Sequence, residues 1–179
     1  IYSGAEARVA GALVGSATAP ITVYGDISKY VSDGAQSLSL SLTLSGASPY
    51  YLYVGALRPI SAVKFYMGAT VNAAGGSTIA AKYWTAGAWT AVSSPSDGTA
   101  VLTQTGTFSF TSTVGLAKPS MINGLYLYWY QFTLTGITAG TSVKYLTVSY
   151  PMQPLVDLWD GVPRALPAFV IYNATTTKY

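Results

Sequence analysis

Six carboxylates are the acid–base groups available near neutral pH in this sequence, which contains no histidine and no cysteine. Without these two residue types, Ser-His-Asp and Cys-His catalysis, imidazole metal ligands and thiolate metal sites are all excluded. The carboxylates are Glu6, Asp26, Asp33, Asp97, Asp157 and Asp160. Asp33, Asp97 and Asp160 each precede a glycine, a pairing typical of turns, so we expect structural roles for them.

A hydrolase acting on sugars needs two carboxylates that face each other across the substrate. The nearest pair in the sequence is Asp157 and Asp160, which flank Trp159 in a proline-rich segment and offer no such arrangement. Calcium needs several oxygen ligands close together, and no Asp-x-Asp-x-Asp run is present, although a site of loop carbonyls stays open. The sequence therefore predicts a protein that is not an enzyme and has no cofactor and no metal site.

Aromatic side chains are the second class of candidate site residue. They could form a platform on which a pyranose ring stacks, or they could pack in the core and at subunit contacts, where Tyr and Trp are favoured. The candidates for an interface or ligand platform are Tyr51, Tyr53, Trp84, Trp89, Tyr128, Tyr130 and Trp159. Separately, Asn173-Ala174-Thr175 fits the acceptor pattern for N-glycosylation, which matters only in a glycosylating secretory route.

The composition narrows the classes of partner. Half of the 179 residues are hydrophobic and only 8% are charged, against about 25% in ordinary soluble domains. The net charge of +3 comes from scattered residues, so no basic patch points to nucleic acid. The sequence has no stretch of about 20 apolar residues, which is the length that a membrane-spanning helix needs. A surface with few charges and many Tyr, Ser, Thr and Ala residues suits a subunit that is buried in an assembly or one that faces glycans.

Short β-strands at intervals of about ten residues predict an all-β fold. The clearest strand is Ser37–Leu44, where Ser or Thr alternates with Leu and one face must be buried. Leu125–Leu134 is apolar on both faces, which indicates a central strand. Further predicted strands cover 21–24, 50–54, 60–67, 78–84, 89–92, 100–104, 106–111 and 142–150, with 100–104 and 106–111 forming a hairpin.

These strands favour an antiparallel β-sandwich, jelly-roll-like, with extended N- and C-terminal arms. We expect three parts: an N-terminal arm at 1–20, a β-sandwich domain at 21–150 and a Pro-rich C-terminal arm at 151–179. The small-residue stretch within 9–21 is compatible with an arm or with a first strand. Pro151, Pro154, Pro163 and Pro167 remove backbone donors and break regular structure in the last part.

A series of aromatic and turn motifs resembles a β-sandwich module of tailed-phage virion structural proteins. The motifs are Tyr83-Trp84, Gly87-Ala88-Trp89-Thr90, Asp97-Gly98-Thr99, Gly106-Thr107-Phe108-Ser109-Phe110, Pro119 and Leu127-Tyr128-Trp129-Tyr130, within residues 50–161. Gln131 stands where that family often has Arg. The resemblance implies a non-catalytic subunit of a virus particle, in a tail, baseplate, capsid-decoration or fibre position.

The expected function is therefore a virion structural protein that assembles through exchange of its arms and through Tyr/Ser/Thr-rich faces. Its partners would be copies of itself and other virion proteins, and its location an extracellular particle. The alternative is a carbohydrate-binding or host-attachment module that uses exposed aromatic residues, with a glycan as partner. Neither nucleic acid nor a membrane is an expected partner.

Overall fold

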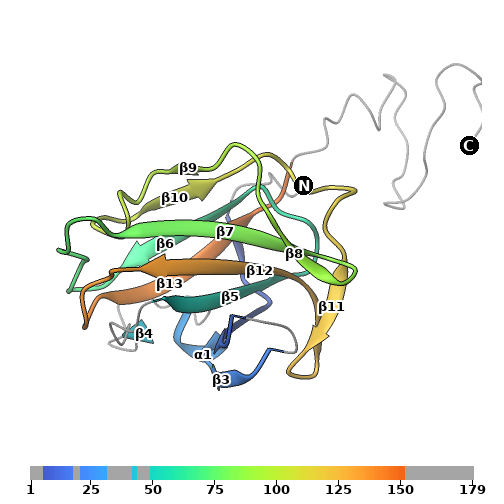
Figure 1. The fold of residues 1–179 in the computed structure, drawn as a ribbon, viewed down its shortest axis with the longest axis horizontal. Coiled ribbons are helices and arrows are strands. Elements are labelled where there is room, and N and C mark those ends of the chain that lie inside the picture. The colour runs from blue at the N-terminus through green and yellow to red at the C-terminus, as the bar shows by residue number, and fades with distance from the viewer. Residues whose placement is uncertain (1–5, 18–20, 32–41, 44–48, 152–179) are drawn as a thin grey trace, which may run out of the picture.

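The computed structural model describes residues 6–17, 21–31, 42–43 and 49–151, which fold into two antiparallel sheets packed face to face (Figure 1). Sheet A contains β1 (Ala7–Arg8), β4 (Leu42–Thr43), β6 (Ala62–Met67), β9 (Ser96–Asp97), β10 (Gly106–Ser109) and β13 (Ser142–Ser149). Sheet B contains β2 (Gly11–Gly15), β3 (Val23–Asp26), β5 (Tyr50–Ala56), β7 (Thr78–Thr85), β8 (Ala88–Ala91), β11 (Pro119–Ile122) and β12 (Leu125–Thr135). The helix α1 (Ser28–Val31) is a single turn. The predicted antiparallel β-sandwich is confirmed.

The strand order is β1-β13-β6-β10-β9 in sheet A, with β4 also on β13. In sheet B it is β3-β2-β5-β12-β7-β8, with β11 also on β12. Consecutive strands β5, β6 and β7 lie alternately in the two sheets, so their connections cross from one sheet to the other at the ends of the sandwich. Strand β11 pairs with residues 125–128 of β12, and β7 pairs with residues 130–135 on the same side of that strand.

The core lies between the two sheets and is rich in phenylalanine. Phe132 of β12 meets Phe65 of β6 and Phe108 of β10 edge-on, with ring centroids 5.4 and 5.5 Å apart. All three rings are buried. Edge-to-face contacts of this kind add to the free energy gained by burial alone, so they help to fix how the sheets face each other.

Strand β12 is central and covered on both faces, as its sequence predicts. It pairs with β5 on one side and with β7 and β11 on the other. Tyr130, Phe132 and Leu134 point into the core between the sheets, whereas Leu127 and Trp129 belong to a second apolar cluster on the outer face of sheet B.

Residues 7–15, which the sequence placed within an N-terminal arm, form strands β1 and β2 of the sandwich. Ala7 and Arg8 pair with β13, and Gly11–Gly15 pairs with both β3 and β5. Ala12 and Leu13 are completely buried. The alternative of a first strand therefore holds for this stretch, because its small residues let it pack closely against larger neighbours.

The predicted strand at 100–104 is wrong. Residues Ala100, Val101 and Leu102 all have positive φ angles, between 49° and 64°, and form a left-handed turn. The carboxylate of Asp97 stabilises this turn by accepting hydrogen bonds from the backbone nitrogens of Thr99 and Val101, at 2.8 and 2.6 Å. Strand β10 pairs instead with β9, and the expected turn role of Asp97 is confirmed.

Some of the predicted elements fall outside the described residues. Of the alternating strand Ser37–Leu44, only Leu42 and Thr43 are described, as β4. The C-terminal arm lies beyond the described part from residue 152 onward.

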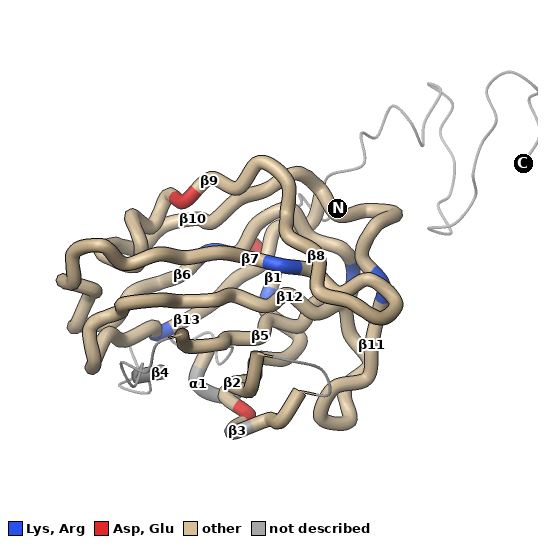
Figure 2. Tube along the Cα trace, viewed as in Figure 1, with Lys and Arg blue, Asp and Glu red and all other residues tan. Residues whose placement is uncertain are grey.

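Charge is sparse over the whole described fold. Figure 2 shows isolated blue and red segments on a mostly tan tube, with no stripe of one sign. Among the described residues, no helix has the length and hydropathy needed to cross a bilayer.

Ionisation of the buried core tyrosines should lower the free energy of unfolding at alkaline pH. Burial raises the pKa of Tyr130 from 10.0 to about 12, and burial also raises the pKa of Tyr50 and Tyr150. Between about pH 10 and 12 the folded chain holds these protons more tightly than the unfolded chain, so the free energy of unfolding must fall as pH rises. Urea titrations from pH 9 to pH 12 should show this fall, and Tyr130→Phe should reduce its slope; an equal slope in the variant would contradict the assignment.

Candidate binding face

Three tryptophans lie side by side on the outer face of sheet B. Trp84 of β7 is directly opposite Trp89 of β8. Tyr83 of β7 pairs with Tyr130 of β12, so in this antiparallel register the next residue of β7, Trp84, lies beside Trp129. Residues opposite each other in an antiparallel pair point to the same side of the sheet. The row crosses three adjacent strands, and with Tyr51 and Tyr53 of β5 it forms what we call the aromatic face.

Three rings of the aromatic face form a row of contacts. Trp84 and Trp89 meet edge-on with centroids 5.2 Å apart, and Trp89 meets Tyr53 at 5.5 Å. Tyr53 is buried, while Trp84 and Trp89 are partly exposed. The contacts therefore run from a buried ring at β5 to rings that reach solvent at the edge of the sheet.

Two glycines make room for Trp129 on this face. A Cβ atom added to Gly55 would lie 2.7 Å from Leu127 Cδ1 and 3.0 Å from Trp129 Cζ3, and one added to Gly11 would lie 3.4 Å from Trp129 Cη2. The indole ring thus lies over the backbones of β5 and β2. Its Nε1 donates to the carbonyl oxygen of Ser120 on β11, at 3.0 Å, which fixes the ring on the other side.

A buried amide joins the aromatic face to the segment after β2. Gln131 Nε2 donates to Tyr53 Oη at 2.7 Å and to the carbonyl oxygen of Ala17 at 3.1 Å. Tyr53 in turn donates its hydroxyl proton to the carbonyl oxygen of Ser16. A buried amide with these partners restrains the neighbouring rings, because breaking either bond would leave a polar group unpaired.

Two further features of the face bear on binding. Lys82 of β7 is exposed, and its neighbours across the sheet are Gln131 and Ala91. The Nε1 atom of Trp89 is buried and has no hydrogen-bond partner among the described residues. An unpaired buried donor of this kind is uncommon in folded proteins.

The structure brings together four of the seven predicted aromatic residues: Tyr51, Tyr53, Trp84 and Trp89. Tyr128 and Tyr130 point to the opposite side, toward the core, and Tyr130 is completely buried. Its hydroxyl accepts from the backbone nitrogen of Ile60 at 2.9 Å, so it is not available to a ligand. Trp159 and Asn173 lie outside the described residues.

Sequence reasoning did not place Gln131 and Lys82 among the candidates, and it did not separate Trp129 from Tyr128 and Tyr130. The strand alternation of β12 carries the missing signal, since Trp129 and Gln131 share one parity and Tyr128 and Tyr130 the other. Once β12 is recognised as a strand covered on both faces, the two sets must point in opposite directions.

Each carboxylate that the structure describes has hydrogen-bond partners within the fold. Asp26 accepts from the backbone nitrogen of Ser28, and Asp97 is held in its turn. Glu6 binds Lys64 Nζ at 2.5 Å and the Tyr66 hydroxyl, and these two hydrogen bonds lower its pKa. Within the described part of the chain, no three acidic residues form a group that could hold a metal ion.

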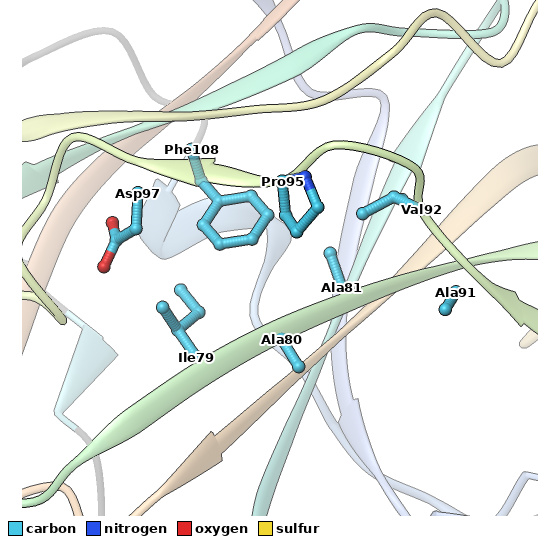
Figure 3. A pocket seen from close by; sticks show the side chains of 8 residues that line it. All are labelled: Ile79, Ala80, Ala81, Ala91, Val92, Pro95, Asp97 and Phe108. Carbon is cyan, nitrogen blue, oxygen red and sulfur yellow. The ribbon is translucent and has the colours of Figure 1, made fainter.

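A small hollow of about 260 Å³ opens between the edges of the two sheets (Figure 3). Ile79 and Ala81 of β7 line one side, and Phe108 and Pro95 the other. Its acidic residue, Asp97, already binds the turn backbone with both carboxylate oxygens. The hollow is apolar and falls below the usual size of ligand pockets, about 300–1,000 Å³, so the aromatic face is the stronger candidate.

The glycine that accommodates Trp129 provides a stability prediction. Gly55→Ala places a methyl group against the Trp129 ring, and overpacking of this kind should lower the free energy of unfolding by about 1–3 kcal/mol. The matched control is Gly25→Ala, where no atom lies within 4 Å of the new Cβ. Urea denaturation of both variants measures the difference, and equal stabilities would contradict the packing described here.

No family model and no curated protein matches the chain. Among solved structures, SpGH29 superposes with a TM-score of 0.48 and 8% identity, covering 81% of this chain, which spans only 28% of that protein. The CBM32 of AlyQ in complex with 4,5-unsaturated mannuronic acid gives 0.47 and 12%, covering 82% of this chain and 98% of the module. CpGH89CBM32-6, produced by Clostridium perfringens, gives 0.44 and 10%, covering 78% and 92%. With TM-scores below 0.5, these likenesses carry no argument about function.

Proposed function

We propose that the chain is a non-catalytic carbohydrate-binding module whose ligand lies on the aromatic face. The observation that carries this proposal is the row of contacting rings Tyr53, Trp89 and Trp84, in which the last two remain partly exposed. The apolar faces of a pyranose ring stack on such indole rings, and Trp84 at the solvent end of the row is the principal contact.

Polar groups beside the rings supply the hydrogen bonds that a sugar needs. Lys82 lies two residues before Trp84 on the same strand face, and its ammonium group donates to hydroxyl oxygens. A buried glutamine fixes Tyr53, so part of the face is ordered before the ligand arrives and less entropy is lost on binding.

The described carboxylates are compatible with binding without turnover. Asp97 and Glu6 have structural partners in sheet A and its turn, whereas Asp26 lies opposite Leu13 on the outer side of sheet B and accepts from the backbone nitrogen of Ser28. The ligand would therefore be held and released unchanged.

Trp84→Ala is the direct test of this function. Removing the exposed indole should weaken binding of an oligosaccharide roughly tenfold, since a central aromatic contact is worth more than about 1 kcal/mol in many interfaces. Isothermal titration with oligosaccharides of glucose, N-acetylglucosamine and galacturonic acid would supply the affinities. The matched control is Tyr126→Ala, an exposed ring on the other side of the sheet, which should bind as the parent does. Equal affinity in both variants, or no binding by the parent chain, would refute the proposal.

A second candidate is the virion structural subunit. It is supported by a group of exposed large apolar side chains at one end of the sandwich, including Leu57, Val114 and Met121, which resembles the surface of a subunit contact. Arm exchange cannot involve residues 7–15, because these form β1 and β2 of the same sandwich.

Light scattering on the full chain tests the assembly candidate. A subunit of a particle should form oligomers whose molar mass rises with concentration, and Leu116→Asp should abolish them by placing a charge in the contact. A constant mass near 18.7 kDa at every concentration would contradict this second candidate.

A further inference from the structure

One end of the sandwich carries five large apolar side chains that are mostly exposed. They are Leu57, Val114, Leu116, Met121 and Tyr126, which are between 53% and 70% exposed. Of the large hydrophobic side chains that are exposed in the described residues, only Val71 lies elsewhere, in the β6–β7 connection at the opposite end. Exposed apolar groups gathered in this way mark a surface that is normally covered. We call this surface the apolar end.

Hydrogen bonds hold the segments of the apolar end together. Thr113 donates its hydroxyl proton to the carbonyl oxygen of Ile60, which ties the loop of Val114 and Leu116 to the loop after Leu57. The backbone nitrogen of Lys118 donates to the carbonyl oxygen of Trp84. Met121 and Tyr126 face each other across the β11–β12 hairpin, so they project from the same side.

The described chain leaves the sandwich at this same end. The backbone nitrogen of Leu57 donates to the hydroxyl of Tyr150 at 3.3 Å, and the guanidinium of Arg58 lies 4.7 Å from the centre of the Tyr150 ring. Pro151 is the next residue and the last one described. The point from which residues 152–179 continue therefore lies next to the apolar end.

The stretch 155–160 matches this surface in polarity and charge. It contains Leu155, Val156, Leu158 and Trp159, and a second apolar run lies at 168–172. Asp157 and Asp160 flank Leu158-Trp159, whereas Arg58 and Lys118 are the basic residues at the apolar end. Acidic groups on either side of an apolar pair would thus meet basic groups beside an apolar surface.

We propose that residues 155–160 of the same chain dock on the apolar end, with Leu158 and Trp159 against Leu116 and Met121. The reach is sufficient, because the roughly seven residues from Pro151 to Leu158 span up to about 25 Å, against about 10 Å between packed sheets. Attachment through Pro151 gives the segment a high effective concentration, which favours docking in its own chain over docking in a second copy.

The absence of cysteine allows a direct test on the full chain. Leu116→Cys is labelled with a bimane fluorophore, which tryptophan quenches on contact, and compared with the same labelled chain carrying Trp159→Phe. Trp84, Trp89 and Trp129 are present in both, so the difference reports Trp159 alone. Docking predicts brighter emission in the Trp159→Phe chain at every dilution. The control label at Val71→Cys should give equal emission with and without Trp159.

Three results would overturn the proposal. Equal emission of the two Leu116→Cys chains would show that Trp159 is not at the apolar end. Quenching of the labelled Trp159→Phe chain by added unlabelled parent chain would assign the surface to a second copy. A spectral shift of the label that appears only with phosphatidylserine vesicles would assign it to a membrane. Because none of these readouts uses a sugar, the proposal stands or falls independently of glycan binding.

Discussion

The fold depends on covering both faces of β12. Its inward residues Tyr130 and Phe132 complete the core between the sheets, and its outward residue Trp129 needs an apolar environment on a face that would otherwise meet solvent. A second, smaller cluster forms on the outer face of sheet B around Leu13 and Tyr53. A sandwich with one outer face partly apolar differs from the usual pattern, in which that face is polar along every strand.

The outer cluster explains why the aromatic face is ordered and yet reaches solvent. Glycine at 55 lets the indole of Trp129 lie on β5, and the Gln131–Tyr53 hydrogen bond fixes the ring next to it. Trp89 and Trp84 extend the cluster to the edge of the sheet, where the rings are only partly covered and reach solvent. Packing that stabilises the strand thus also presents rings to a ligand, so the same row of contacts would serve both structure and binding.

The sequence predicts the architecture of this chain better than its site. Alternation and turn residues locate β5, β6, β7, β12 and β13, because side chains on a half-buried strand must alternate. The turn at Ala100–Leu102 escapes prediction, since nothing local in its sequence demands a left-handed backbone and the Asp97 contacts form only in the fold. The residue types of the aromatic face could be predicted from the sequence. Which of these residues lie on the same side of the sheet could not, because that depends on the pairing of β5, β12, β7 and β8.

Stacking of a sugar on the exposed part of the aromatic face is the central claim. The most direct measurement is a nuclear magnetic resonance titration that follows the four indole N–H signals, one for each tryptophan, as an oligosaccharide is added. Stacking predicts that the signals of Trp84 and Trp89 shift with ligand concentration while that of Trp129, bound to Ser120, stays in place. Trp84 and Trp89 signals that stay unmoved as the oligosaccharide is added would contradict it.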